Sequence, residues 1–192
     1  MAAHGIRNEA LYVVAVLTGL RQGELLGLKW IDVDLAAGKL TVRRSLKVTE
    51  DGLDFAHPKN KASRRSVPLN KTSVSALRSH RLRQNEERVR SRAWCDTDLV
   101  FPNHIGGPTD HNNLYYREYK PLLERAGLAD EGFTFHTLRH TLATTLLMRR
   151  EHPKVVQSLL GHSSITQTMD TYSHLMDDIG GDAVNGLDEA FG

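Results

Sequence analysis

Residues 135–150 read FHTLRHTLATTLLMRR, and this stretch decides the fold because it is the most regular helical pattern in the chain. Its apolar residues recur at intervals of three and four positions, as they do on one face of a helix. His136 and Arg139 are three positions apart, so a helix places both side chains on one face. The stretch therefore predicts a helix over 135–150 that directs a histidine and an arginine into one pocket.

Further helices are expected on both sides of this one. Asn8 is a suitable N-cap for one or two helices that reach Leu28, and the glycines within that stretch mark a break or close packing. Asp110 can cap a helix that Gly127 ends. The remaining helical patterns cover 71–92, 153–160 and 164–176.

A strand region separates the first helices from the rest. Residues 30–34, 40–48 and 65–69 alternate or are rich in β-branched residues, with turns at 36–38 and 50–52. Pro68 indicates an edge strand or a strand end, since proline cannot donate to a ladder. We predict a mainly α fold with a small antiparallel β-sheet of about three strands near the N-terminus, an α+β domain that spans residues 1–192.

Composition favours a globular protein that stays where it is made. Hydrophobic residues make up 40% and charged residues 25% of the chain. No apolar run approaches the roughly 18 residues that a membrane span needs, and no apolar segment of a secretion signal follows Met1. Cys95 is the only cysteine, so an intrachain disulfide and a cysteine zinc cluster are excluded. We expect a cytoplasmic protein with no membrane contact.

Charge is distributed unevenly along the chain. Residues 59–92 hold eleven Lys or Arg against two Glu, whereas the tail 177–192 holds five acidic residues and no Lys or Arg. A stretch this basic can contact several phosphates of a DNA duplex. For 72–92 alone, a solvated helix face explains the charge equally well. The residues expected to contact DNA are therefore those of the strand region, Arg43, Arg44, Lys61, Arg64 and Arg65.

The His136–Arg139 pair suits a phosphate group. Arg139 offers a planar fork for two phosphate oxygens, and His136 can donate to phosphate or assist proton transfer. His136 and His140 are also four positions apart, a spacing that zinc sites use. Thr137 stands where a metalloprotease helix has glutamate, and no carboxylate is evidently placed as a third ligand. Metal binding is thus the weaker interpretation.

Other polar residues have both a functional and an ordinary explanation. Arg21 lies among apolar neighbours, so it needs an anionic partner, either Glu24 in a helix pair or a phosphate from a ligand. His162 follows Gly161 at a helix end, where a polar cap is the default. Tyr172 lies in a polar, turn-rich segment, where a packed ring with a solvated hydroxyl is common.

Together these segments resemble the catalytic domain of the tyrosine recombinase (phage integrase) family. The resemblance runs from about Glu9 to Met176 and includes the Arg21 segment, the hairpin 59–69, the segment 136–141 and the segment 160–174, in that order. It implies that Arg21 and Arg139 clamp the phosphate and that Tyr172 is the nucleophile. It further implies roles for His136 as acid or base, for His162 as a donor to a nonbridging oxygen, and for Lys59, or Lys61, as the general acid.

The resemblance also implies how the protein works. Tyrosine attacks the phosphodiester and conserves its bond energy as a 3′-phosphotyrosine, so no metal or other cofactor is required. Family members generally carry an N-terminal DNA-binding domain, which this chain is expected to lack. The full protein is expected to act on double-stranded DNA as a homotetramer, associated with the nucleoid. A DNA-binding module that kept the fold but lost the reaction is the alternative, although none of the six catalytic groups is missing.

Overall fold

Two helices at the N-terminus place a loop at the centre of the molecule. The computed structural model describes residues 5–56, 64–162 and 164–166. Helix α1 (Glu9–Thr18) ends at Gly19, which has a left-handed φ of 62°, and α2 (Gln22–Leu26) follows after two residues. A side chain at Gly19 would collide with Leu160 of another helix. The prediction of one or two helices broken at a glycine is confirmed, with close packing as the physical reason.

The predicted antiparallel sheet is present, and its strand order is β1-β2-β5. Strands β1 (Val33–Asp34), β2 (Lys39–Val42) and β5 (Arg65–Pro68) pair so that Leu40 lies opposite both Val33 and Val67. Pro68 ends the edge strand β5, as predicted. A separate hairpin consists of β3 (Ser45–Thr49) and β4 (Gly52–Ala56).

Two strand predictions are wrong in part. Trp30–Asp32 forms a 3-10 turn, η1, rather than a strand, since Trp30 is held by a backbone bond to Asp98 and by an indole bond to Gln84. The predicted strand 40–48 is two strands in different sheets. The chain leaves β2 at Arg43 and Arg44, both of which pair with the buried carboxylate of Asp32.

The helices after the sheet begin at side-chain caps, and Asp110 is a cap that the sequence predicted. Asn70 accepts from Ser73 N at the start of α3 (Lys71–Arg90), and Asp110 accepts from Asn113 N at the start of α4 (His111–Leu114). The helix continues through a π-helical turn, η3 (Tyr115–Tyr119), into α5 (Lys120–Arg125). The 3-10 turn η4 (Ala129–Glu131) leads to α6 (Phe135–Met148) and α7 (Pro153–Leu160). The predicted helix 164–176 lies almost entirely outside the described residues.

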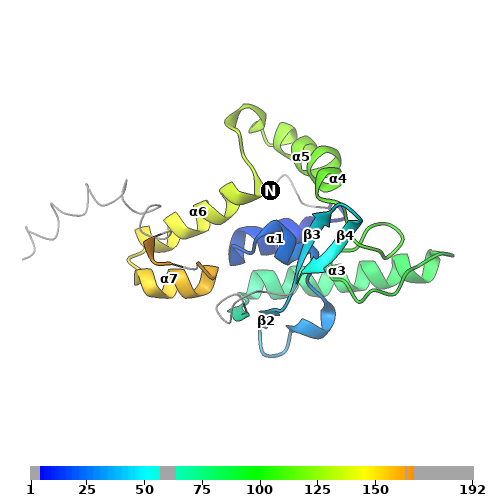
Figure 1. The fold of residues 1–192 in the computed structure, drawn as a ribbon, viewed down its shortest axis with the longest axis horizontal. Coiled ribbons are helices and arrows are strands. Elements are labelled where there is room, and N and C mark those ends of the chain that lie inside the picture. Colours follow the sequence, from blue (N-terminus) through cyan, green and yellow to red (C-terminus); the bar gives the residue numbers. More distant parts are fainter. Residues whose placement is uncertain (1–4, 57–63, 163, 167–192) are drawn as a thin grey trace, which may run out of the picture.

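Helix α1 is the centre of the packing, with α3 on one side and α6 on the other (Figure 1). Its buried Tyr12 stacks on Tyr119 of η3 and also meets Phe135 of α6. Four buried residues, Ala143, Leu147, Val156 and Leu160, join α6 to α7 in a second cluster. The N-terminus of α6 and the C-terminus of α7 are thereby brought to the α1–α2 loop. Among the described residues, no helix is both long and apolar enough to cross a membrane.

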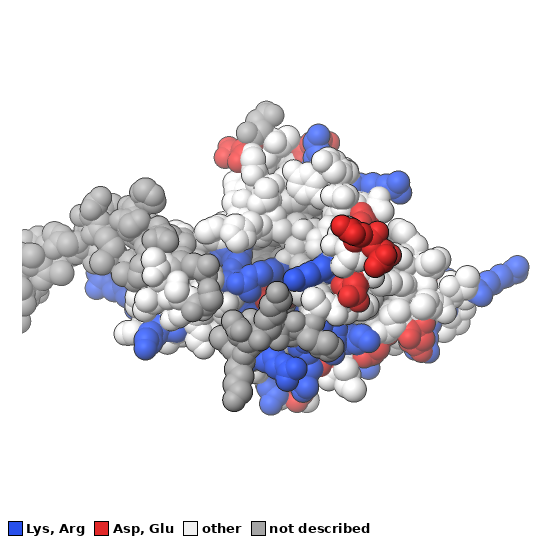
Figure 2. All heavy atoms as spheres, in the orientation of Figure 1, with Lys and Arg blue, Asp and Glu red and all other residues white. Residues whose placement is uncertain are grey.

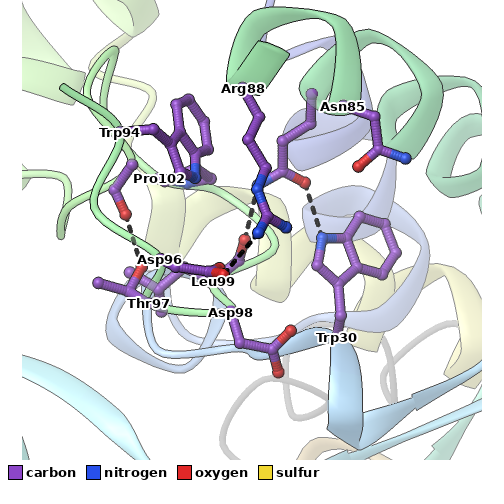
Figure 3. A pocket seen from close by; sticks show the side chains of 11 residues that line it. Trp30, Asn85, Arg88, Trp94, Asp96, Thr97, Asp98, Leu99 and Pro102 are labelled. Carbon is purple, nitrogen blue, oxygen red and sulfur yellow. Dashed lines mark hydrogen bonds and ion pairs between the residues drawn. The ribbon is translucent and has the colours of Figure 1, made fainter. Parts of the chain in front are cut away.

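A small pocket lies between α3 and the segment 94–106, and side-chain bonds that join these two parts of the chain line it (Figure 3). Within it the Trp30 indole donates to Gln84 at 2.7 Å, and Arg88 pairs with Asp96 at 2.7 Å. Its volume is about 50 Å³, which suits a few water molecules and not a larger ligand. None of the predicted site residues lines it.

Candidate active site at the α1–α2 loop

Arg139 is a buried arginine at the start of α6. Thr134 caps this helix by accepting from Thr137 N, which fixes the first turn that carries His136 and Arg139. The Arg139 side chain lies in the interior, with the residue 3% exposed, and Nη1 donates to Gly19 O at 2.7 Å. Its Nη2 is buried and has no hydrogen-bond partner among the described residues. A buried guanidinium nitrogen without an acceptor is costly, so this atom is a candidate contact for an anion.

Arg21 lies just beyond Gly19, at the N-terminus of α2. Its Nη1 pairs with Glu24 Oε1 at 3.0 Å, and its Nη2 donates to Gly161 O at 3.3 Å. The predicted helix pair with Glu24 is therefore formed. The apolar neighbours are buried as expected, but the Arg21 side chain itself is 43% exposed. The Arg21 guanidinium can therefore bind a further anion from solvent.

Arg65 does not lie on the surface, in contrast to its predicted contact with DNA. Its side chain is 7% exposed and pairs with the equally buried Glu24 at 2.9 Å. Residues of β5 alternate between buried and exposed, and Arg65 is on the same face as the buried Val67. The strand pattern itself indicated that Arg65 is buried, because side chains two positions apart share a face.

His162 follows α7 at the same place. Gly161 ends the helix with a φ of 67°, and the next backbone N–H, that of His162, donates to Gln157 O at 3.1 Å. The His162 side chain is half-buried. Because Arg21 donates to the Gly161 carbonyl, the turn before His162 is attached directly to the arginine loop. The structure thus brings Arg21, Arg139 and His162 together.

The electrostatics of this cluster favour a negatively charged ligand. Burial, and then the charges of Arg139 and Arg21, lower the pKa of His162 to about 4. Burial and the nearby Arg21 lower the pKa of Arg139 to about 9, which leaves it cationic at neutral pH. Figure 2 shows Lys and Arg side chains at the centre of the face that it draws, at the position where Figure 1 draws α1 and β3. Excess positive charge attracts phosphate and repels metal cations.

His136 lies at the edge of the cluster on the exposed side of α6. Its ring meets the His140 ring edge-on, with 4.5 Å between centroids. Partial burial, followed by the charges of His140 and Arg139, lowers the pKa of His136. The two histidines share a face as the spacing predicts, but the described residues contain no group of three metal-ligating side chains suited to a metal ion.

The other predicted site residues divide into two sets. Lys59, Lys61 and Tyr172 lie outside the described residues, so their roles stay predictions. Arg64 is exposed, and Arg43, with a side chain 63% exposed, pairs with Asp32 at 2.9 Å. Arg44 is only 15% exposed and also pairs with Asp32. Arg43 and Arg64 therefore remain available to DNA more readily than Arg44.

Similarity to known proteins extends over most of this chain. It is 38% identical to a tyrosine recombinase XerC-like protein of Caldanaerobacter subterraneus subsp. tengcongensis, over 99% of this chain and 51% of the relative. It is 34% identical to tyrosine recombinase XerC of Xylella fastidiosa, over 89% of this chain and 49% of the relative. The chain thus spans about half the length of these curated relatives.

Solved structures confirm the predicted tyrosine recombinase catalytic-domain fold. XerA recombinase superimposes with a TM-score of 0.69 at 29% identity, covering 88% of this chain and 53% of that one. The Tn1549 transposon integrase in complex with transposon right end DNA gives a TM-score of 0.72 at 26% identity, covering 86% and 54%. Residues 1–178 match the phage integrase family. The chain accordingly belongs to the phage integrase family of tyrosine recombinases.

Proposed function

We propose that this chain is the catalytic domain of a site-specific DNA recombinase that cuts and rejoins double-stranded DNA through a 3′-phosphotyrosine. The observation that carries the proposal is the buried Nη2 of Arg139, unpaired within the described part of the chain and close to the exposed guanidinium of Arg21. Two arginines with free donor capacity suit the nonbridging oxygens of a phosphodiester.

The relatives support DNA as the substrate. XerH, at 29% identity and a TM-score of 0.66, is bound to difH substrate in a pre-cleavage complex. The Tn1549 integrase that resembles this chain is bound to transposon right end DNA. By analogy, the complete protein acts on double-stranded recombination sites as a homotetramer in the cytoplasm, associated with the nucleoid.

In the proposed reaction, Tyr172 Oη attacks phosphorus and the bond to the 5′ oxygen breaks. His136 accepts the tyrosine proton, and Lys59, or Lys61 in its place, donates a proton to the leaving 5′ hydroxyl. Arg21, Arg139 and His162 stabilise the extra negative charge of the pentavalent transition state. Because the arginines supply the positive charge, the step requires no metal ion. Rejoining is the reverse reaction with a different 5′ hydroxyl.

A catalytically silent DNA-binding module is the competing function. It requires the same basic surface but not the convergence of Arg21, Arg139 and His162 on one point. This convergence favours the enzyme, since surface arginines alone are sufficient for phosphate contacts.

Suicide duplexes test the proposal. Nicked duplexes covering the DNA that flanks the gene are incubated with the protein expressed from its complete reading frame, so that cleavage releases a short fragment and traps the covalent product. We expect a DNA-linked band on a denaturing gel that disappears in Tyr172→Phe. Binding of the same duplexes without any linked band would support the silent module instead.

A further inference from the structure

Arg65 is a buried arginine that connects three parts of the candidate active site. It extends from the start of β5, and its Nη1 and Nη2 donate to the two carboxylate oxygens of Glu24 at 3.0 and 2.9 Å. Its Nε donates to the carbonyl of Leu159, near the end of α7, at 3.0 Å. All three nitrogens of the guanidinium are therefore used inside the protein.

Glu24 is shared between two arginines. The guanidinium of Arg65 holds both of its oxygens, whereas the guanidinium of Arg21 reaches only Oε1, and the backbone N–H of Arg21 donates to Oε2 at 2.9 Å. Burial favours protonation of Glu24, but the hydrogen bonds and charges of Arg65 and then of Arg21 together lower the pKa of the carboxyl group. A buried carboxylate needs a counter-ion. Because Arg65 supplies it, Arg21 is left 43% exposed rather than fully engaged by Glu24.

The α7 side of the contact is equally close. A Cβ atom on Gly161 would lie 2.7 Å from Nη1 of Arg65, so the glycine allows the guanidinium to pack against the turn. Arg21 donates to the carbonyl of the same glycine. Arg65 thus contacts both the turn that precedes His162 and the carboxylate that orients Arg21.

We propose that Arg65 is a positioning residue that holds Arg21 and His162 in one geometry and keeps Arg21 available for the scissile phosphate. The proposal rests on the recombinase function proposed above. It gives Arg65 a different role from a DNA contact, since its guanidinium acts through Glu24 and the α7 turn. Lysine cannot replace it, because lysine has no planar fork for Glu24 and no second nitrogen for Leu159.

The test uses single-turnover cleavage of suicide duplexes by the protein from its complete reading frame. One duplex carries an ordinary scissile phosphate, and the other carries a methylphosphonate, which lacks one negatively charged oxygen. We expect Arg65→Met and Arg65→Lys to slow cleavage of the ordinary phosphate by about 100-fold, with duplex affinity within about threefold of wild type. On methylphosphonate the loss should fall below about tenfold, because less charge has to be neutralised by Arg21.

The double variant Glu24→Gln/Arg65→Met tests whether an unpaired Glu24 is what disables Arg21, whereas a loss of folding would slow cleavage of both duplexes equally. It removes the buried charge together with its counter-ion, so it avoids the unpaired carboxylate of Arg65→Met. It should cleave at least about tenfold faster than Arg65→Met, since no unpaired carboxylate captures Arg21. Arg149→Met, which removes an exposed arginine of the α6 C-terminus, is the matched control and should cleave at the wild-type rate.

Three results would overturn the positioning role while leaving the recombinase function intact. They are cleavage by Arg65→Met within threefold of wild type, an equal loss on both duplexes, and a double variant no faster than Arg65→Met. A wild-type protein that binds the duplexes without forming any covalent product would instead overturn the proposed function, and the positioning role with it.

Discussion

The guanidinium of Arg139 donates to the backbone carbonyl of Gly19 at 2.7 Å, so a helix late in the chain is connected to the loop after the first helix. The contact spans 120 residues of sequence. It uses one terminal nitrogen of Arg139 and leaves the other buried without a partner among the described residues. One half of the side chain thus holds the loop, and the other half is available to a phosphate oxygen.

Arg139→Lys should slow DNA cleavage by about 100-fold or more, equivalent to roughly 3 kcal/mol. An ammonium group cannot serve both the Gly19 carbonyl and a phosphate oxygen in the same geometry. Cleavage rates measured under single-turnover conditions check this expectation, with duplex affinity measured alongside. A variant with wild-type cleavage would show that the second nitrogen has no part in the reaction.

Gly19→Ala should destabilise the protein by about 2–4 kcal/mol, because the left-handed backbone and the contact with Leu160 both exclude a side chain. Gly132 is a matched control, since its φ is 64° and no described atom lies within 4 Å of the place a Cβ atom would take. Gly132→Ala should cost only about 1 kcal/mol. Urea unfolding midpoints compare the two, and equal losses would contradict the packing explanation.

His80 should make the protein sensitive to acid. It is 4% exposed, its Nε2 lies 2.6 Å from Val100 O, and burial lowers its pKa to about 4. In the unfolded chain His80 therefore binds a proton near pH 6.5, whereas in the folded protein it binds one only near pH 4. Stability contributed by neutral His80 is complete above pH 6.5 and decreases as the pH falls through this window.

The size of this effect can be measured by substitution. Between pH 7 and pH 4.5 the contribution of His80 to the free energy of unfolding should fall by about 2–3 kcal/mol. His80→Phe keeps the ring packing against Phe101 and removes the titration. The difference in unfolding free energy between the two pH values should shrink by that amount in the variant. An unchanged difference would assign the acid sensitivity to other groups.

His162 should remain neutral well below the ordinary range of histidine, because burial and the arginine charges lower its pKa to about 4. Histidine signals followed by NMR during a pH titration measure this value. Arg139→Gln removes one of the positive charges and should raise the pKa of His162. If the pKa of His162 stayed the same in the variant, the two side chains would not be electrostatically coupled.

Local signals in the sequence predicted the fold well. The cap Asp110, the proline at the end of β5 and the helical period of 135–150 each depend on neighbouring residues alone. The division of 40–48 between two sheets could not be predicted in this way, because it depends on Asp32 drawing Arg43 and Arg44 away from the ladder.

The candidate site could be predicted from the sequence only in part. Residue order was sufficient to select Arg21, Arg139 and His162, which the structure brings together. The internal role of Arg65 was missed, because a basic residue next to other basic residues was taken as a surface contact. Its partner Glu24 is 41 positions away, and only the folded chain places the two side chains face to face.

The central claim is a covalent bond between Tyr172 and DNA. Suicide-duplex products would be digested with protease and nuclease, and the nucleotide-linked peptide sequenced by mass spectrometry. We predict a peptide containing Tyr172 whose phenolic oxygen carries the 3′-phosphate of the cleaved strand. Attachment to another residue or to a 5′-phosphate, or binding and cleavage without any linked peptide, would contradict the mechanism.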